Sequence, residues 1–360
     1  MIIKQMHLKN FRNYEDCSVI FDEKMNIIHG DNAQGKTNIL EAIYVCATSK
    51  SHRTNYFKEM IQMGLDSAHI TLDIEKEGEP FTIDVHFRKS NKKNIAINKL
   101  PVKKIDELLG VLHVIMFSPE DLSLIKSGPK ERRRFIDIEL SQLDGVYYKY
   151  LHQYHHLLKQ RNALLKECQK NYSKSLKDQL DIWNIQFIEM GSKVIRYREK
   201  FITDLNIIYQ KRHYDISGNQ EKMNLVYEKN TSIEEFEKKI SASTQRDIRF
   251  GSTTVGPHRD DLLFELDGVD LRKYGSQGQQ RTAALSLKLS EIDLVVQQNN
   301  IRPILLLDDV LSELDGHRQI YLMNHLSDIQ TFITCTGVED FIRKNNHHKR
   351  FFHIKSGEIA

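Results

Sequence analysis

The feature that most constrains this chain is a glycine-rich stretch at residues 30–37, which reads GDNAQGKT. It fits the pattern G-x-x-x-x-G-K-[ST], follows a short apolar segment and precedes a helical pattern of apolar residues. Glycines let the backbone curl so that successive N–H groups face an anion, and a helix N-terminus adds partial positive charge. The stretch therefore predicts a phosphate-binding loop between a strand and a helix, the Walker A motif.

The side chains of such a loop have distinct roles. Lys36 is expected to reach the outer phosphates of a nucleotide and to act in catalysis, and the Thr37 hydroxyl is expected to ligate Mg²⁺. The residues predicted to contact nucleotide are Gly30, Asp31, Asn32, Ala33, Gln34, Gly35, Lys36, Thr37 and Asn38.

A second motif lies at residues 304–315, which read ILLLDDVLSELD. An apolar strand that ends in two acids is a Walker B arrangement. Asp308 is expected to hold Mg²⁺ directly or through water, and Asp309 to orient or deprotonate the attacking water. A solvated turn is the alternative interpretation, and the phosphate loop elsewhere in the chain disfavours it.

A third motif, GSQGQQR at residues 275–281, opens a helix and so forms a second anion site. Gly278 precedes Leu305 by 27 residues. At that distance before Walker B, Ser276, Gly278 and Gln279 match the LSGGQ-type signature of ABC ATPases, with Gln277 in place of the first glycine.

Composition excludes several classes of protein. The chain of 360 residues has a formal net charge of +3, which by itself does not indicate nucleic acid. Its four cysteines are far apart and form no C-x-x-C, which argues against a zinc site of the usual spacing and against a disulfide scaffold. No run of about 18 apolar residues is present, so we expect no membrane span and a cytoplasmic location.

Periodicity gives the coarse organisation. Alternating residues between 68 and 114 predict an antiparallel meander that continues into a strand at 111–117, with lysines at its 88–93 tip. Helical sequence dominates from 118 to 211. There Phe187, Val194, Phe201 and Ile208 recur every seven residues and predict a seam against the helix at 145–170. Residues 220–245 are polar with a helix at 232–240, and 253–267 is predicted as a strand.

Together these motifs resemble the ABC/SMC-like ATPases, and more narrowly the RecF family of bacterial recombination-mediator ATPases. The matching stretches are LKNFRNY (8–14), GDNAQGKTNILEAIY (30–44), FSPEDL (117–122), RRRFID (132–137), VGPHRDDL (255–262), YGSQGQQR (274–281) and LLLDDVLSELD (305–315). They span nearly the whole chain in the family's order.

The resemblance implies an α/β fold: an ABC-type ATPase head, with a P-loop NTPase lobe containing a mixed sheet and a mainly helical second lobe. Lobe I would comprise residues 1–116 and 300–360, and lobe II, with the signature, residues 117–299.

The resemblance also implies the cofactors ATP and Mg²⁺ and an ATP-dependent homodimer in which two heads bury two ATPs. Ser276 of one head would contact the γ-phosphate held by Lys36 of the other, and Asp315 would lie at the dimer interface. Arg12 would reach the nucleotide phosphates.

RecF-like proteins bind DNA in an ATP-dependent manner, and with RecR and RecO they help load RecA onto gapped DNA. We therefore expect duplex DNA or single/double-strand junctions as a partner. Thr336 and Gly337 stand where many ABC ATPases carry a switch histidine, and Asp309 is shorter than the usual glutamate. Both differences predict a weak ATPase.

Several interpretations stay open. Arg132, Arg133 and Arg134 could meet DNA phosphates, or could pair with acids and cover surface. The 88–93 tip could reach backbone phosphate or could be a merely solvated hairpin. The run His258-Arg259-Asp260-Asp261 is either a metal cluster or a structural turn, and we favour the turn. Alternative functions are a non-hydrolysing, ATP-switched DNA binder and a P-loop transferase. The signature argues against the transferase, and the missing histidine argues against a transporter subunit.

Overall fold

The computed structural model describes residues 1–90, 92–171, 173–326, 328–337 and 349–359. The chain forms two compact units: Met1–Asp121 with Glu291–Ala360, and Leu122–Ser290. The sequence predicts breaks after residues 116 and 299 instead. The second observed break falls inside helix α8 (Gln277–Asn299), a position that periodicity alone does not mark. Among the described helices, none is long and apolar enough to cross a membrane.

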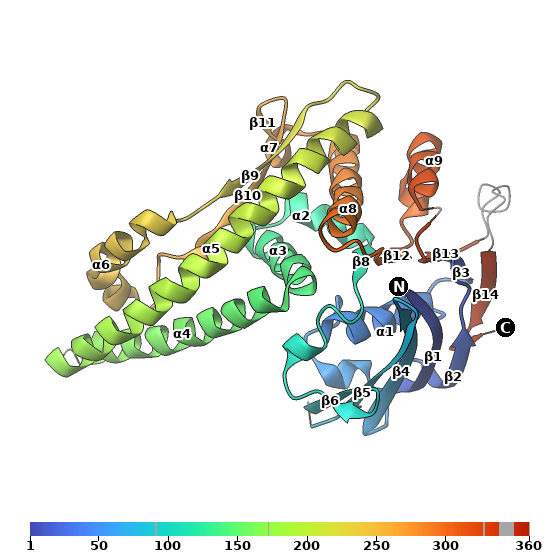
Figure 1. Cartoon of the computed structure of the whole chain (residues 1–360), viewed down its shortest axis with the longest axis horizontal. Coiled ribbons are helices and arrows are strands. Elements are labelled where there is room, and N and C mark those ends of the chain that lie inside the picture. Colours follow the sequence, from blue (N-terminus) through green and yellow to red (C-terminus); the bar gives the residue numbers. More distant parts are fainter. Residues whose placement is uncertain (91, 172, 327, 338–348, 360) are drawn as a thin grey trace. The chain divides into compact units, whose positions relative to one another are not determined.

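The first unit contains a mainly parallel sheet in the order β15-β14-β3-β13-β12-β8 (Figure 1). Its strands are β3 (Met25–His29), β8 (Val114–Phe117), β12 (Ile304–Asp308), β13 (Thr331–Cys335), β14 (Lys349–Lys355) and β15 (Glu358–Ile359). Every residue of β12 is buried, as expected for an apolar run inside a parallel sheet. Because β13 pairs in parallel with both β3 and β12, the carboxyl ends of all three strands meet at one edge.

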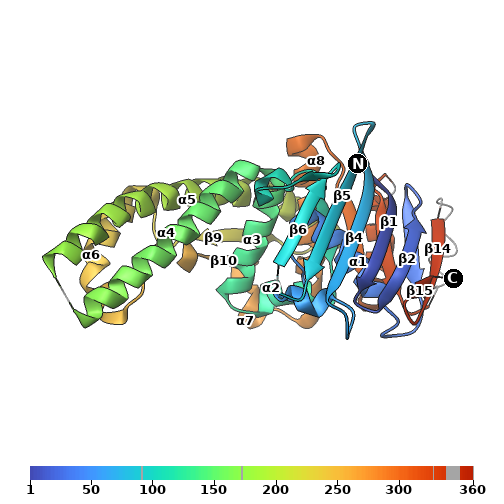
Figure 2. The same ribbon diagram turned by 90° about the horizontal axis from the view of Figure 1, so that it is seen from below.

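An antiparallel sheet in the order β2-β1-β4-β5-β6-β7 completes this unit (Figure 2). Its strands are β1 (Ile2–Phe11), β2 (Tyr14–Ile20), β4 (Ser67–Lys76), β5 (Glu79–Arg88), β6 (Lys92–Ile97) and β7 (Leu100–Pro101). The meander is confirmed, but its predicted extension to 111–117 is wrong. β8 is a continuously buried strand without polar alternation, and it pairs in parallel with β12.

Helix α1 (Lys36–Thr48) follows the glycine-rich loop. All of its residues from Ile39 to Thr48 are buried, because one hydrophobic cluster joins α1 to the inner face of the antiparallel sheet and to residues of β8, β12 and β13. The sequence of a helix that is buried on every side has apolar residues on all of its faces, rather than on one amphipathic stripe.

The second unit is mainly helical. Its long elements are α3 (Pro129–Leu143), α4 (Gly145–Lys170), α5 (Lys174–Ile216), α6 (Ile233–Phe250) and the first part of α8, with short α2 (Leu122–Lys126) and α7 (Leu271–Tyr274). α5 is one continuous helix of 43 residues and lies along α4 (Figures 1 and 2). Phe187, Val194 and Phe201 are buried in it, which confirms the predicted seam for these three residues, whereas Ile208 is partly exposed.

A small sheet in the order β11-β10-β9 lies in the same unit, built from β9 (Met223–Glu228), β10 (Asp261–Leu266) and β11 (Val269–Asp270). Two sequence predictions are wrong here. β9 lies in the stretch that the sequence predicts to be polar. The strand was missed because Met223 and Leu225 alone of its residues are buried, which leaves a weak alternation. The strand predicted from residue 253 begins only at Asp261, since the preceding loop is held by side-chain hydrogen bonds rather than by a strand partner.

Candidate nucleotide-binding site

The glycine-rich loop connects β3 to α1, as predicted, and its lysine forms hydrogen bonds with the backbone at the start of the loop. Lys36 is 7% exposed, and its Nζ donates to the carbonyl oxygens of Gly30 at 2.7 Å and Asp31 at 2.9 Å. Gly30 has a φ of 148°, and a Cβ there would overlap the carbonyl oxygen of Ile354 in β14. A side chain at this position is therefore excluded by both conformation and space.

The turn between β1 and β2 holds the loop from one side. Asn13 Nδ2 donates to the carbonyl oxygen of Gln34 at 2.7 Å, and its Oδ1 accepts from Asn38 Nδ2 at 2.8 Å. The Tyr14 hydroxyl donates to the carbonyl oxygen of Gly35 at 3.1 Å. The LKNFRNY stretch thus supports the loop through neutral hydrogen bonds, a role that the sequence analysis missed for Asn13 and Tyr14.

The β14–β15 hairpin holds the same loop through Gln34. The backbone N–H of Ser356 donates to Gln34 Oε1 at 2.6 Å, and that of Gly357 donates to the Gln34 carbonyl oxygen at 3.2 Å. Gly357 has a φ of 83°, and a Cβ there would overlap the carbonyl oxygen of Asn13. No sequence motif signals this contact, because its partners are more than 300 residues apart.

A hydrogen bond joins Walker A to Walker B. Thr37 Oγ1 donates to Asp308 Oδ1 at 2.8 Å, across 271 residues of sequence. Mg²⁺ takes hard oxygen ligands, and it is usually bound by one or two carboxylates together with substrate phosphates. A hydroxyl and one carboxylate side by side fit that pattern. Among the described residues, no group of three or more histidine, cysteine or acidic side chains forms an alternative metal cluster.

Asp309, the predicted catalytic acid, follows the end of β12 in a left-handed backbone conformation with a φ of 57°. Aspartate is among the few residues that adopt this region without large strain. Its backbone N–H donates to Thr334 Oγ1 at 2.9 Å, and its carbonyl oxygen accepts from the Ser312 hydroxyl at 2.7 Å. The turn therefore directs Asp309 away from the line of the strand, just beyond Asp308.

The signature residues begin α8 in the second unit. Ser276 Oγ accepts from the backbone N–H of Gln279 at 3.2 Å, and Gln279 Oε1 accepts from the backbone N–H of Ser276 at 2.9 Å. This reciprocal pair is a capping box. At Gly278 a Cβ would have only the Ser276 hydroxyl within 4 Å, at 3.9 Å. The contact of Ser276 with a nucleotide held by a second chain stays a prediction.

Comparison with known proteins places this geometry in a family. A family model described as RecF/RecN/SMC N terminal domain matches residues 2–359. A DNA replication and repair protein RecF from Agathobacter rectalis is 54% identical over all of this chain and 99% of its own length. A RecF from Lachnospira eligens is 49% identical with the same coverage of both chains. The chain belongs to the RecF family.

Solved structures agree with this assignment. A structure of the recombination mediator protein RecF-ATP in the RecFOR pathway has a TM-score of 0.92 and 33% identity, over 100% of this chain and 97% of that chain. An Smc head bound to the C-winged helix domain of ScpA has a TM-score of 0.57 at 14% identity, which supports the fold alone. The predicted fold class, an ABC/SMC-type ATPase head with a mainly helical addition, is confirmed.

Arg12 of this RecF-family chain forms a forked ion pair with Glu41 of α1. Its Nε and one terminal nitrogen donate to the two carboxylate oxygens of Glu41 at 2.8 Å and 2.6 Å, and Ser51 donates to the same carboxylate at 2.5 Å. Burial would raise the pKa of Glu41, but the hydrogen bonds from Arg12 and Ser51 outweigh it and hold the pKa below its ordinary value. A contact of Arg12 with nucleotide phosphates stays a prediction.

Asp315, predicted at a dimer interface, is the N-cap of α9 (Gly316–His325). Its carboxylate accepts from the backbone N–H of Arg318 at 2.9 Å, and this hydrogen bond lowers the pKa of Asp315. Its side chain is 54% exposed. The interface role stays a prediction.

The arginines at 132–134, a possible DNA-binding segment, differ from one another in burial and in hydrogen-bond partners. Arg132 is 2% exposed and binds Asp261 with two hydrogen bonds, at 2.6 Å and 3.0 Å, so of the two open interpretations Arg132 follows the pairing with an acid. Arg133 donates to the Asp260 carbonyl oxygen at 2.6 Å and is half-buried. Arg132 and Arg133 thus face the β10 segment, whereas Arg134 forms an ion pair with Glu131 of its own helix at 3.9 Å. A run of like residues does not reveal this division.

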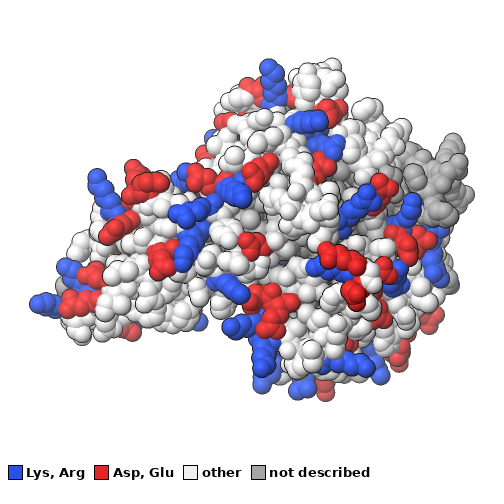
Figure 3. Space-filling model, in the orientation of Figure 1, with Lys and Arg blue, Asp and Glu red and all other residues white. Residues whose placement is uncertain are grey.

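The 88–93 tip also differs from a solvated hairpin. Lys93 Nζ donates to the hydroxyl and carbonyl oxygens of Ser49, the C-cap of α1, and lies 4.6 Å from the ring centroid of Phe57. Burial, with a smaller effect of Lys50, lowers the pKa of Lys93 to about 8. Arg88, Lys89 and Lys92 are exposed, and residue 91 lies outside the described residues. On the face drawn in Figure 3, basic and acidic side chains are interspersed.

The VGPHRDDL stretch proves to be structural. Asp260 is fully buried and accepts from Tyr227, from Arg198 at 3.4 Å and from the backbone N–H of Asn230 at 2.8 Å. His258 binds the Tyr154 hydroxyl at 2.6 Å, and burial lowers its pKa to about 4. The interpretation as a structural turn is confirmed.

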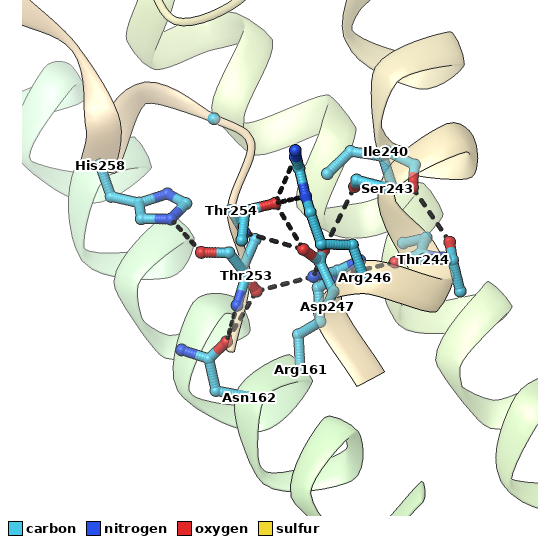
Figure 4. Close-up of polar contacts among 12 residues, drawn as sticks. Arg161, Asn162, Ile240, Ser243, Thr244, Arg246, Asp247, Thr253, Thr254 and His258 are labelled. Carbon is cyan, nitrogen blue, oxygen red and sulfur yellow. Dashed lines mark hydrogen bonds and ion pairs between the residues drawn. The ribbon is translucent and has the colours of Figure 1, made fainter. Parts of the chain in front are cut away.

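A buried ion pair lies beside this turn and was missed by the sequence analysis (Figure 4). Arg161 of α4 and Asp247 of α6 are both fully buried and bond at 2.8 Å. Arg161 also donates to Thr253 Oγ1 at 2.7 Å, and Asp247 accepts from the Thr254 hydroxyl at 2.6 Å. Two helices and one loop are thereby joined through a single pair of charges.

Proposed function

We propose that this chain is an ATP-dependent DNA-binding protein of recombinational and replication-gap repair, and that its ATP-bound form is a homodimer. The observation that carries the proposal is the bond between Thr37 and Asp308, which joins a phosphate loop to an acidic strand end at 2.8 Å. The names of its RecF relatives and the solved RecF-ATP structure support the nucleotide and the pathway.

The dimer proposal rests on where the two motifs lie. Lys36 and Asp308 belong to one unit, and Ser276, Gly278 and Gln279 belong to the other. In the proposed dimer, the signature of each chain completes the ATP site of its partner, and Asp315 lies at that interface. ATP then stabilises the association of two chains, and hydrolysis releases it.

The proposed activity is slow ATP hydrolysis. Lys36 would neutralise charge on the outer phosphates, and Thr37 and Asp308 would hold Mg²⁺, which would supply further charge neutralisation there. Asp309 orients the attacking water. No histidine stands at the end of β13, where Thr336 is exposed. A turnover rate above about 1 per second, within the ordinary enzyme range, would contradict this proposal.

The proposed DNA partner is duplex DNA or a single/double-strand junction. By family resemblance, RecR and RecO act with this chain to load RecA on gapped DNA. Binding that depends on ATP and weakens steeply with salt is expected, because phosphate contacts release counterions. Binding that depends on neither ATP nor salt would reject the model.

The decisive experiment is sizing of the full chain with and without ATP. The variants are Lys36→Arg, Ser276→Arg and the matched control Ser232→Arg, which alters the N-cap serine of α6. Wild type and Ser232→Arg should gain mass with ATP, whereas Lys36→Arg and Ser276→Arg should not. If ATP leaves the mass of the wild type unchanged, the dimer proposal fails.

A second candidate function is an ATP switch that binds DNA without hydrolysis. The left-handed turn that carries Asp309 and the missing histidine favour this alternative. Replacing Asp309 with asparagine distinguishes the two, because only a hydrolysing protein loses phosphate release in this variant.

A further inference from the structure

Thr334, in the middle strand of the site, contacts both Walker B acids. It lies on β13, which is flanked by β3 and β12, and it is 1% exposed. Thr334 Oγ1 donates to Asp308 Oδ1 at 2.8 Å and accepts from the backbone N–H of Asp309 at 2.9 Å. One hydroxyl group therefore bridges the two acids that the sequence assigns to metal binding and to water activation.

The direction of the hydroxyl proton follows from the distances. Thr334 has one proton to donate, and the carbonyl oxygen of Leu307 is 3.5 Å away, much farther than the Asp308 carboxylate. Hydrogen bonds to ionised acceptors are also stronger than those to neutral carbonyls. The proton is therefore donated to Asp308, and a lone pair of the same oxygen is left for the N–H of Asp309.

The second bond holds an unusual backbone turn. Asp309 has a φ of 57°, so its N–H does not continue the parallel ladder of β12. An unpaired N–H at the buried end of a strand is costly, and Thr334 supplies its acceptor. The bond thereby fixes the peptide between Asp308 and Asp309, and with it the direction in which the Asp309 carboxylate leaves the backbone.

We propose that Thr334 is a positioning residue that orients Asp308 for Mg²⁺ and Asp309 for the attacking water. This inference rests on the proposed ATP site and deepens it. Thr37 also donates to Asp308 Oδ1, but Thr37 is itself an expected Mg²⁺ ligand. Thr334 also donates to Asp308 Oδ1, but Thr334 is not an expected Mg²⁺ ligand. Partners that orient metal ligands typically contribute 10–100-fold to metal affinity or activity.

Two substitutions separate the hydroxyl from the shape of the side chain. Thr334→Val keeps the branched shape and removes both hydrogen bonds, whereas Thr334→Ser keeps the hydroxyl. Thr331→Val is the matched control: Thr331 is a buried threonine on the same strand, and among the described residues its hydroxyl donates to the Ile329 carbonyl oxygen, at 3.0 Å, and not to a Walker B acid. Thermal unfolding of each full-length variant checks that it is folded.

The test measures binding of a fluorescent ATP analogue in EDTA and during MgCl₂ titration, together with phosphate release. In EDTA all variants should bind alike. Thr334→Val should need about 10–100-fold more Mg²⁺ for its binding transition and lose turnover by a similar factor. Thr334→Ser and Thr331→Val should resemble the wild type in both measurements.

Three results would overturn the inference: a Thr334→Val variant with wild-type Mg²⁺ dependence and turnover, a Thr334→Ser variant as impaired as Thr334→Val, or an equal loss in Thr331→Val. The Mg²⁺ titration does not require a dimer or DNA. A wild type that binds the analogue but stays monomeric would therefore contradict the proposed function while still testing Thr334.

Discussion

At the scale of single residues, Lys93 makes stability depend on pH. An unfolded chain keeps a lysine proton up to about 10.5, whereas folded Lys93 loses its proton near pH 8. Between those values the unfolded state binds more protons, so stability from this group rises with pH and is lost as pH falls through about 8. At neutral pH, burial of the Lys93 ammonium beside Ser49 therefore lowers the stability of the folded state.

This behaviour predicts a pH-dependent difference between the wild type and Lys93→Met. The melting temperature of the wild type should rise relative to that of the variant as the pH rises from 7 to 10.5. In that range folded Lys93 loses its proton, which removes the buried charge, whereas the variant has no charge to lose. Thermal scans in matched buffers measure the difference. A difference that stays constant with pH would show that Lys93 titrates as an ordinary lysine.

The Arg12–Glu41 pair predicts a loss of stability. Arg12→Ala removes the charged partner that Glu41, whose side chain is fully buried, holds at 2.6 Å, and leaves Arg53 at 3.8 Å as a more distant one. Breaking a buried pair in this way typically costs about 3–5 kcal/mol. Lys4→Ala, which removes an exposed pair with Glu23, is the control and should cost about 1 kcal/mol or less. Urea unfolding followed by circular dichroism compares them, and similar costs would contradict the buried-pair argument.

At the scale of elements, the β14–β15 hairpin should tune nucleotide affinity. Gly357 and Gly78 have φ values of 83° and 84°, each in a hairpin turn of the same unit, but only Gly357 faces a neighbouring carbonyl. Gly357→Ala should therefore weaken ATP binding by displacing Gln34. Gly78→Ala bears the same backbone strain and should not. Equilibrium binding of a fluorescent ATP analogue tests this, and equal effects of both changes would reject it.

The buried charges of the second unit predict coupling between α4 and α6. Arg161→Met leaves Asp247 buried and unpaired, and should lower stability by about 3–5 kcal/mol. Asp247→Leu in the same chain should recover part of that loss, because no uncompensated charge then remains. A double-mutant cycle measured by urea unfolding checks this prediction. Strictly additive losses would show that the two residues act independently.

At the scale of the whole molecule, the proposed dimer predicts complementation between inactive variants. Each ATP site would need Lys36 from one chain and Ser276 from the other. Neither variant should form an ATP-dependent dimer with itself, so the dimers in an equal mixture of Lys36→Arg and Ser276→Arg would be mixed and would hold one intact site in two. Phosphate release should therefore rise above that of either variant alone, to about half of the wild-type rate at most. A mixture no more active than its components would contradict sites shared between chains.

The sequence by itself determined the motifs whose chemistry is local. A glycine-rich loop before a helix, an apolar strand that ends in acids, and a serine with glutamine three residues later each carry their geometry in nearby residues. For that reason the phosphate loop, the β12 strand, the α5 seam and the start of α8 could be predicted from spacing alone.

The tertiary structure alone decided which distant residues share an environment. The sequence allowed Arg132 to contact DNA, but in the structure it is a buried partner of Asp261. The sequence also allowed Lys93 to be solvated, but in the structure it donates a hydrogen bond to Ser49 at the end of α1. The Ser356–Gln34 and Thr334–Asp308 contacts could not be predicted from the sequence either. Burial and hydrogen-bond partners depend on chain segments brought together by folding, and neither periodicity nor composition records which segments those are.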